Sequence, residues 1–455
     1  MASTYLSRTN TTPTSAYKYT FSAWVKRGEL ATRGQFFRVI NPADTAAYTF
    51  VEFTAGDLIG YNEYDGGVNS IGGQTNAVYR DSNAWYHIVF AVDTTQATGA
   101  DRGKLYVNGV QITSLQNTTT GAQNQTVTAT YSGKDANVGG DPVGSGATRK
   151  FGGLMAHVHF CDGYTYDASA FGETDATTGI WKPKTAPSVT YGTNGFFLKF
   201  ENSGSMGTDS SGNANNFTVN GTMTQTVDTP SNVFCTMNPL AKWTPANTGT
   251  TFSNGNLTLV SSSDYMYNLG TLGVSKGKWY CEMKLTGASG TPNSASGIYV
   301  ARIDGAHNYT TYPFNEASLS TKGYSATGEK RSGATATSYG DSYTSNDIIG
   351  VALDMDNEKV FFSKNGVWQN SGDPVSGTGF AYDDLDNSYY YSIFLSDDTT
   401  AWTGTFNMNF GNGYFGTTAV SSAENPDDGI GIFEYAVPTG YKALCTKSIN
   451  AQEYS

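Results

Sequence analysis

The chain has 455 residues, more than the roughly 250–300 at which one hydrophobic core stops growing, so two domains are expected. Only 15% of the residues are charged, whereas Gly (53), Tyr (30) and Phe (24) are abundant, which favours strands joined by tight turns. The net charge of −12 opposes nucleic acid as a partner, and no apolar run approaches the roughly 18–20 residues of a membrane span, so no membrane insertion is expected.

Alternating apolar residues predict strands at 17–25, 36–40, 47–53 and 84–92. The last strand opens a pattern over 84–109 that ends KLYVNG, and a similar pattern over 347–366 ends FFSKNG. Asn-Gly tolerates the positive φ angles of a type I′ turn, so each pattern predicts a β-hairpin. Two copies far apart in the chain predict two β-sandwich domains of related plan.

Residues 112–150 are polar and rich in Gly, Thr and Asn, and they are expected to form a long surface excursion that could include weak strands. In the strand at 154–160, alternation places Leu154, Ala156, Val158 and Phe160 towards the core, and Met155, His157 and His159 on the opposite face. The two histidines could bind a metal, but without a third ligand nearby a packed or interface face is expected. His87 is expected to be a buried core histidine, and residues 166–171 could form one short helix.

We therefore predict an all-β chain of two tandem antiparallel β-sandwich (jelly-roll) domains with a short C-terminal tail. The first sandwich is expected over 1–225, a linker over 226–250, the second sandwich over 251–420, and a tail or docking arm over 421–455. The four cysteines, widely spaced and without a Cys-x-x-Cys pair, are expected to be free thiols. No signal peptide is recognised at the N-terminus, which predicts synthesis in the cytosol.

The first domain resembles the laminin-G-like and concanavalin-A-like jelly rolls, and the second resembles a SPRY domain. The resembling segments of the first domain are 5–8, 21–27, 85–88, 104–109 and 209–213, and those of the second are 277–282, 323–325, 347–354 and 361–366. Together with the phrases at 171–184 and 438–445, this pairing resembles structural proteins of tailed bacteriophages, especially marine ones.

This resemblance implies a non-enzymatic virion protein: a tail fibre, a head fibre or a capsid decoration. Its implied partners are other virion proteins and a host-surface glycan, and its implied location is the virion, reached by synthesis in the host cytoplasm and release by lysis. Exposed strand edges and the terminal arm predict a homo-oligomer, with a trimer favoured. The rival hypotheses are a polysaccharide depolymerase or glycosidase on the virion, and a bacterial surface adhesin.

The acidic residues offer little support for an enzyme. Jelly-roll glycosidases of the laminarinase type carry Glu-x-Asp-x-x-Glu, and the nearest match, at 173–178, lacks the last acid. The pairs Asp383-Asp384 and Asp397-Asp398 are expected to lie in solvated loops, and 354–358 is expected to be a hairpin turn because the EF-hand pattern fails. No Gly-x-Ser-x-Gly elbow supports a nucleophilic triad. No catalytic residue is therefore predicted.

Two sets of residues remain as candidates for binding. Calcium could be held by Asp93 together with Asp209 or Asn213, although turn residues that cap their own backbone are the alternative; no other cofactor is expected. Aromatic residues that flank strand ends in the second domain are the candidate ligand contacts, because they offer apolar area with a polar tip: Tyr309, Tyr312, Tyr324 and Trp402.

Overall fold

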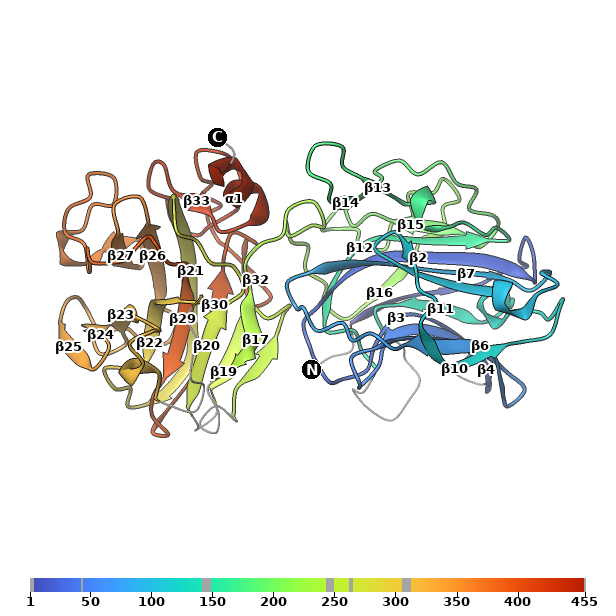
Figure 1. Ribbon diagram of the computed structural model, residues 1–455, viewed down its shortest axis with the longest axis horizontal. Coiled ribbons are helices and arrows are strands. Elements are labelled where there is room, and N and C mark those ends of the chain that lie inside the picture. Colours follow the sequence, from blue (N-terminus) through green and yellow to red (C-terminus); the bar gives the residue numbers. More distant parts are fainter. Residues whose placement is uncertain are drawn as a thin grey trace. The chain divides into compact units, whose positions relative to one another are not determined.

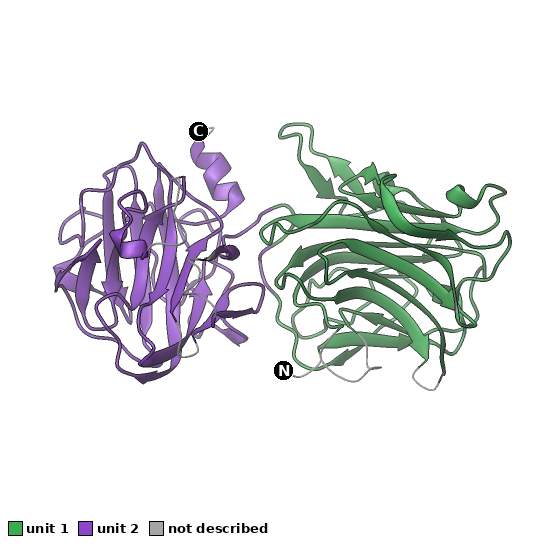
Figure 2. Ribbon diagram, turned by 60° about the horizontal axis from the view of Figure 1, so that its bottom comes forward, with its two compact units in different colours: residues 1–225, 229–231 green, residues 226–228, 232–455 purple. Residues whose placement is uncertain are grey.

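The computed structural model describes residues 4–41, 44–140, 149–242, 249–261, 265–304 and 312–453. The chain divides into two compact units (Figure 1; Figure 2). Unit 1 comprises residues 1–225 with 229–231, and unit 2 comprises 226–228 with 232–455. Each unit contains two large antiparallel sheets, which confirms the predicted all-β fold of two tandem sandwiches.

Unit 1 is a sandwich of an eight-stranded and a six-stranded sheet. The larger sheet runs β10 (Leu115–Thr120), β6 (Val68–Thr75), β5 (Ile59–Asp65), β4 (Asp44–Phe53), β3 (Gly34–Asn41), β11 (Asp135–Val138), β1 (Tyr5–Thr9) and β16 (Thr218–Asn220). The smaller sheet runs β15 (Phe196–Leu198), β12 (Gly153–Asp162), β2 (Lys18–Arg27), β7 (Trp85–Asp93), β8 (Gly103–Val107) and β9 (Val110–Gln111). The inner faces of both sheets build one core, which includes Phe21, Phe37, Val51, Phe90 and Phe160.

Unit 2 repeats this plan with two sheets of its own. One runs β17 (Met237–Lys242), β20 (Met266–Gly270), β29 (Tyr391–Asp397), β22 (Gly297–Arg302), β23 (Lys322–Ser325), β24 (Glu329–Ser332) and β25 (Thr335–Ser338). The other runs β18 (Thr251–Ser253), β19 (Thr258–Ser261), β30 (Trp402–Asn409), β21 (Lys278–Gly290), β26 (Ile348–Asp354), β27 (Lys359–Lys364) and β28 (Val367–Trp368). Strand β17 lies within 226–250, the range expected to be a linker.

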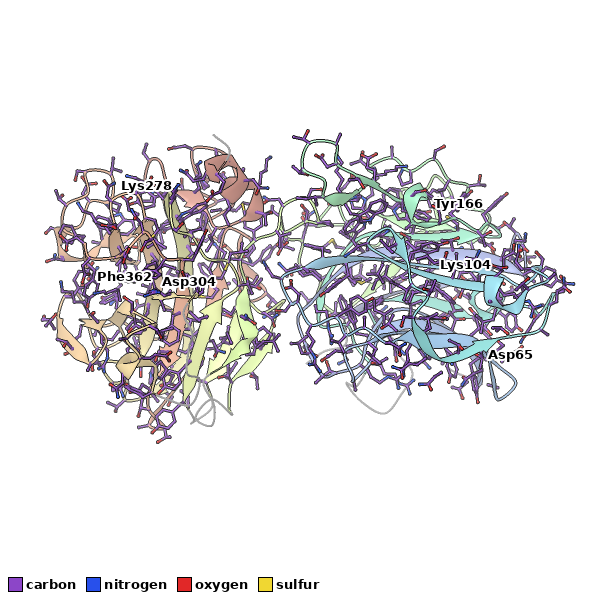
Figure 3. The ribbon with its side chains drawn as sticks, viewed as in Figure 1. Asp65, Lys104, Tyr166, Lys278, Asp304 and Phe362 are labelled. Atoms are coloured by element: carbon purple, nitrogen blue, oxygen red, sulfur yellow. The ribbon has the colours of Figure 1, made fainter. Side chains whose placement is uncertain are left out.

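The repeated pattern forms the same hairpin in both units. In unit 1, β7 pairs with β8, which contains Lys104 (Figure 3). Asn108-Gly109 then forms the turn into β9, with φ angles of 49° and 84°. In unit 2, β26 pairs with β27, which carries Phe362, and Asn365-Gly366 turns into β28 with φ angles of 49° and 79°. These positive angles confirm the type I′ turns that Asn-Gly predicts.

Each turn asparagine also ties its hairpin to the first strand of the pattern. The Asn108 side-chain oxygen accepts a hydrogen bond from the backbone N–H of His87 at 2.8 Å. The Asn365 side-chain oxygen accepts one from the backbone N–H of Ile348, also at 2.8 Å. The asparagine therefore supplies both the left-handed backbone angle and a tertiary hydrogen bond.

Two segments of unit 1 differ from the sequence expectation. Residues 112–150, expected to be a surface excursion, contain β11, an interior strand whose Ala136 and Val138 enter the core. In β12, a bulge between Ala156 and His159 shifts the register, with His157 at a φ of 48°. Met155 consequently packs against the core, whereas alternation had placed it on the opposite face. One extra residue in the strand moves the side chains on the N-terminal side of the bulge to the opposite face of the sheet.

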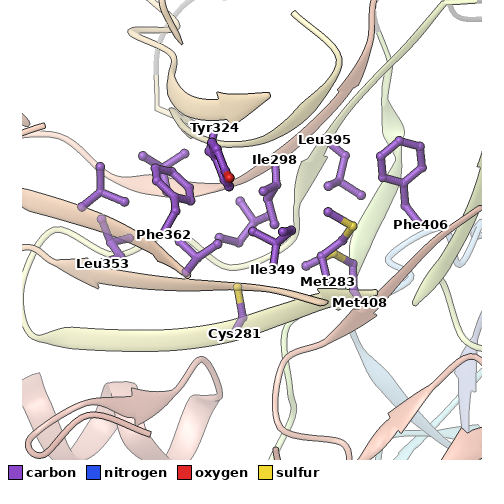
Figure 4. Packing of buried hydrophobic residues seen from close by; sticks show 14 of the residues in the cluster. Cys281, Met283, Ile298, Tyr324, Ile349, Leu353, Phe362, Leu395, Phe406 and Met408 are labelled. Carbon is purple, nitrogen blue, oxygen red and sulfur yellow. The ribbon is translucent and has the colours of Figure 1, made fainter. Parts of the chain in front are cut away.

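The core of unit 2 is built by the inner faces of its two sheets (Figure 4). Cys281, Met283, Ile349 and Phe406 come from one sheet, and Ile298, Tyr324 and Leu395 come from the other. All four cysteines of the chain are free and buried, as the spacing predicted.

The C-terminal segment, residues 421–453, covers the outer face of the β21–β26–β27 sheet. Phe433, Tyr441 and Cys445 of this segment cluster with Tyr280 and Phe361 of the sheet. Strand β33 (Lys442–Ala443) runs parallel to β21, and helix α1 (Thr446–Glu453) follows. The sequence analysis missed α1 because its residues, TKSINAQE, are mostly polar and bury only Ser448 completely.

Short elements complete the fold. Two small hairpins pair β13 (Gly172–Thr174) with β14 (Trp181–Pro183), and β31 (Tyr414–Phe415) with β32 (Thr418–Ala419). Five 3₁₀ turns span Gly99–Asp101, Thr128–Thr130, Ala168–Ala170, Pro313–Asn315 and Gln369–Ser371. The turn at 168–170 stands where the sequence suggested a short helix.

Candidate functional site

The aromatic residues proposed as ligand contacts in the second domain do not form one surface. Tyr324 and Trp402 have exposed fractions of 0% and 2% and belong to the core. They lie within β23 and β30, not in loops, so their rings have no surface to offer a ligand. Tyr309 lies outside the described residues.

Tyr312 is half-buried at the edge of a second cluster in unit 2. Its hydroxyl donates to Asp398 Oδ2 at 2.6 Å, the Tyr267 hydroxyl donates to Asp398 Oδ1, and the Asn293 amide donates to the same carboxylate at 3.2 Å. Burial raises the pKa of Tyr312 above its ordinary value, and the hydrogen bond to Asp398 adds to this. The carboxylate of Asp398 therefore accepts hydrogen bonds from three neighbouring side chains, which fix its loop.

The residues proposed for calcium are separate turn residues. Asp93 accepts hydrogen bonds from the backbone N–H and hydroxyl of Thr95 and from the Gln96 amide, and it pairs with Lys18 at 3.1 Å. This arrangement is the capping alternative, in which the carboxylate satisfies its own turn.

The carboxylate of Asp209 also accepts hydrogen bonds from backbone N–H groups. It accepts from the N–H groups of Phe197, Ser211 and Asn215, each at 2.8 Å. The Asn213 amide donates to the carbonyls of Gly192 and Gly195. Among the described residues no group of three or more His, Cys, Asp or Glu side chains is placed to hold a metal ion.

The outer face of β2, β7 and β12 carries three histidines beneath a covering segment, residues 163–192. His87, fully buried as predicted, stacks on Trp24 with ring centroids 4.7 Å apart. The Trp181 indole N–H of the covering segment donates to His87 Nδ1 at 3.0 Å, so His87 Nε2 carries the proton towards Ser22 Oγ at 2.9 Å. Burial lowers the pKa of His87 to about 3. Because its lone pair is occupied, His87 cannot act as a base for Ser22.

The other two histidines of this face pack among aromatic rings. His159 stacks on Phe197 with centroids 3.9 Å apart, and its Nδ1 lies 3.0 Å from the Tyr191 hydroxyl. Burial lowers the pKa of His159 well below its ordinary value, and the neighbouring His157 lowers it further. His157 and His159 therefore lie on a packed face, as the sequence predicted from the lack of a third metal ligand nearby.

The buried carboxyl groups likewise accept hydrogen bonds from neighbouring residues of the fold. Glu63 in unit 1 accepts from the Tyr19 hydroxyl at 2.5 Å and the Thr128 N–H at 2.7 Å, and burial raises its pKa to about 7. Asp397 was expected in a solvated loop, but it is fully buried at the end of β29, and burial raises its pKa to about 6. The sequence could not show this, because paired acids are usually exposed.

The partial glycosidase motif is an exposed hairpin turn. Asp175 accepts from the N–H groups of Thr177 and Thr178, and it pairs with Lys182 Nζ at 2.8 Å. Glu173 lies on the same lysine at 3.8 Å. These two acids therefore close the β13–β14 turn, which is the ordinary role of such residues.

The strongest candidate for a binding surface is the outer face of β3, β4 and β5 in unit 1, which the sequence analysis missed. The inner face of β4 is apolar, whereas Tyr48, Phe50 and Glu52 point outward between Arg38 of β3 and Tyr64 of β5. Tyr48 stacks on Tyr64 with centroids 4.6 Å apart, and on Phe50 at 6.1 Å. We call these three half-buried rings the aromatic ladder.

A chain of hydrogen bonds fixes two arginines against the ladder. Arg33 donates from Nε to Glu52 Oε1 at 3.0 Å, and Gln35 donates to Glu52 Oε2 at 3.0 Å. Gln35 in turn accepts from Arg38 at 3.4 Å. The Arg38 guanidinium stands 5.1 Å from the centre of the Tyr48 ring, and that of Arg33 stands 5.8 Å from the Phe50 ring. Such stacking orients the guanidinium planes.

A third arginine, Arg149, acts electrostatically on the hydroxyl of Tyr48. Burial raises the pKa of Tyr48 and so does Tyr64, while Arg38, Arg149 and Arg33 each act to lower it. Among the described residues, no hydrogen-bond partner is found for the Tyr48 hydroxyl, the Tyr64 hydroxyl or the Arg149 guanidinium. Tyr48 and Tyr64 lie on the sheet, Arg149 lies in a turn beside it, and all three residues are half-buried. Local sequence could have shown the alternation at 48–52, but not the neighbours from other strands.

Comparison with known proteins agrees with the two folds. Residues 2–168 match the Concanavalin A-like lectin/glucanases superfamily, and residues 279–413 match the SPRY domain. One part of the chain therefore matches a superfamily of lectins and glucanases and another matches the SPRY domain, in agreement with the two β-sandwich units. No curated protein matches the chain.

Solved structures show distant likenesses. The SPRY domain of human HERC1 is 19% identical, with 35% of this chain and 91% of that chain covered and a TM-score of 0.26. A heptameric SAP-like pentraxin from Limulus polyphemus is 13% identical, with 35% and 70% covered and a TM-score of 0.27. Likenesses at these TM-scores carry no argument about function. No helix among the described residues has the length and apolar character needed to cross a membrane.

Proposed function

We propose that this chain is a non-enzymatic structural protein of a tailed-phage virion that recognises host-surface glycans or neighbouring virion proteins. The observation that carries the recognition role is the outer face of β3–β5. There a half-buried aromatic ladder and two arginines fixed by hydrogen bonds lie beside hydroxyl and guanidinium groups for which no hydrogen-bond partner is found among the described residues. Sites on strands hold their groups more accurately than sites on loops.

The chemistry of the described residues supports binding over catalysis. The buried carboxyls of Glu63, Glu282 and Asp397 each serve a separate hydrogen-bond network. A glycosidase needs two carboxyl groups about 5–10 Å apart across one sugar. The imidazole of His87, the natural base for Ser22, is blocked by Trp181.

The virion assignment rests on the paired folds and on the phrases at 171–184 and 438–445. In this proposal the protein is a tail fibre, a head fibre or a capsid decoration, assembled as a homo-oligomer with a trimer favoured. Strand edges are available for such pairing: β9 and β28 close their sheets, and Val110 and Val367 on them are 65% and 67% exposed. Several copies on one particle would raise the avidity of a weak site.

A glycan array of bacterial surface polysaccharides, probed with the full chain, tests the recognition role. We expect binding to a subset of glycans and no release of reducing sugar after prolonged incubation. Turnover that is lost on substitution of named acids would establish the depolymerase instead. Absence of binding to every glycan would remove glycan recognition.

The virion role is tested separately by immunogold labelling of phage particles whose genome encodes the chain. Label confined to the tail tip supports a fibre, and label over the shell supports a decoration. Particles without label would contradict the virion assignment and leave glycan binding to be judged by the array.

A further inference from the structure

We propose that the outer face of β3–β5 in unit 1 binds the anionic group of an acidic saccharide, through Arg149 and the hydroxyls of Tyr48 and Tyr64. This inference rests on the proposed recognition of glycans and specifies the class of glycan. The shared chemistry of the ligand is a carboxylate or phosphate carried on a sugar.

This face carries several hydrogen-bond donors that suit an anion. Arg33 and Arg38 are held by the hydrogen-bonded chain through Glu52 and Gln35, so they contribute fixed positive charge. Arg149 leaves the sheet next to them, because its carbonyl accepts from the Gln35 N–H at 3.1 Å. Its guanidinium acts on Tyr48 together with those of Arg38 and Arg33. Guanidinium groups with adjacent hydroxyls suit the oxygens of an anion.

The rings of the aromatic ladder lie nearly parallel to one another. The planes of Tyr48 and Tyr64 differ by 16°, and those of Tyr48 and Phe50 differ by 18°. Because the rings face one another, the ladder presents ring edges and hydroxyls outward, and few ring faces on which a neutral sugar could stack. Ring edges carry partial positive charge, as the donors beside them do. The face therefore favours hydrogen-bonding anions over apolar sugar faces.

The charge of this face differs from that of the chain as a whole. The chain carries a net charge of −12, and polyanions are repelled unless a local positive patch receives them. Three guanidinium groups, Arg33, Arg38 and Arg149, lie near this face, where Glu52 supplies a carboxylate that pairs with Arg33. Asp135 lies on β11 opposite Ile40 of β3, and its carboxylate accepts from the Thr9 hydroxyl at 2.6 Å. Where several copies of the chain are held together, a repeating acidic polysaccharide that engages more than one of them gains affinity through avidity.

The decisive experiment measures affinity of the full chain for matched charged and uncharged saccharides. The carboxylate arm uses oligogalacturonate and its methyl ester, and the phosphate arm uses phosphorylated mannan and mannan. We expect binding to at least one charged member, at least tenfold weaker binding to its uncharged partner, and weakening as salt rises from 50 to 200 mM. Equal affinity for both members in both arms would overturn the proposal.

Substitutions locate the site. Arg149→Gln is expected to weaken binding about tenfold, through loss of a charge-assisted hydrogen bond, and Tyr48→Phe or Tyr64→Phe about threefold. The matched control Lys104→Gln removes the same charge from β8 of the other sheet (Figure 3). Tyr17→Phe removes the hydroxyl of a tyrosine that is 39% exposed elsewhere in unit 1. If Arg149→Gln and Lys104→Gln weaken binding equally, the anion is not held at this face.

Other occupants have distinct outcomes. Polyglutamate that binds as tightly as oligogalacturonate, and is lost in Arg149→Gln, would overturn the saccharide in favour of an acidic peptide. A change of sedimentation coefficient in Arg149→Gln, with saccharide binding intact, would assign the face to a second copy of this acidic chain. An array positive only for neutral glycans would refute this inference and leave the proposed function standing.

Discussion

The two units share one hairpin device but differ in what covers the outer face of the sheet that contains it. In unit 1, residues 163–192 cover the face, and they meet buried imidazoles: Trp181 binds His87, and Tyr191 lies against His159. In unit 2, the C-terminal segment covers the face and meets a buried carboxyl, Glu282, which accepts from the N–H groups of Glu434 and Tyr435. The same sheet arrangement is therefore covered in two ways. In unit 1 the cover meets imidazoles whose pKa is lowered, and in unit 2 it meets a carboxyl whose pKa is raised.

The largest effect is expected from removal of the carboxyl that closes unit 2. Glu282 also accepts from the Tyr280 hydroxyl and the Asn409 amide, so Glu282→Ala leaves four donors unsatisfied at a buried site. We expect loss of about 3–5 kcal/mol of the stability of this region. Hydrogen exchange should show faster exchange in 421–453 and in β21, with little change in unit 1.

Glu453→Ala is the matched control, because it removes the same charge from an exposed residue at the end of α1. Equal exchange in the two variants would mean that Glu282 does not hold the C-terminal segment.

The second effect is an opposite response of the two covers to pH. His87, with a folded pKa of about 3, and His159 are held neutral, whereas in the unfolded chain they protonate below about pH 6.5. The stability that they support is complete above pH 6.5, and it falls by about 1.4 kcal/mol per pH unit for each histidine as the pH drops further. Glu63, with its pKa raised to about 7, offsets one of these two losses.

In unit 2 the direction reverses. The folded-state pKa is raised to about 7 for Glu282 and to about 6 for Asp397, so both groups take up protons on folding between their unfolded values and these values. Stability is greatest at the acidic end of that window, and it declines as the pH rises through it. Between pH 7.5 and 5 we expect exchange, corrected for its intrinsic rate, to quicken in 163–192 and to slow in 421–453. Changes of the same sign in both segments would contradict this.

A third, smaller effect tests the shared device itself. Asn108→Ala and Asn365→Ala each place a Cβ-bearing residue without a polar side chain at a φ of 49°, and each removes the hydrogen bond to the preceding strand. We expect each to cost about 1–2 kcal/mol, in its own unit only. Because the Asn365 amide also donates to Asp347 Oδ1 at 2.7 Å, Asn365→Ala should cost at least as much as Asn108→Ala, and denaturant unfolding that shows the reverse order would contradict this.

The smallest effect concerns a single donor. Trp181→Phe keeps an aromatic ring in the cover of unit 1 but removes the N–H that binds His87 Nδ1. We expect a loss of about 1 kcal/mol and faster exchange in 163–192 as pH falls, because the freed nitrogen can accept a proton. Trp368→Phe, in the unit 2 hairpin, serves as the control. An unchanged pH response would show that Trp181 does not keep His87 neutral.

Local sequence determined the parts of this protein that depend on neighbours along the chain. The alternation at 84–92 and 348–353 predicts strands, and Asn-Gly predicts turns, because strand period and positive φ are properties of a few consecutive residues. The wide cysteine spacing likewise predicted free thiols. Chain length indicated two domains, and composition favoured strands joined by tight turns.

Tertiary structure decided which faces are covered and which residues meet. Tyr324 and Trp402 lie at strand positions whose face is buried by the opposite sheet, and a bulge at His157 reverses the facing of Met155. The candidate binding face joins Arg149 to Tyr48 and Tyr64 from two different strands. Cross-strand register and the path of covering segments arise from long-range packing, so no stretch of sequence carries them.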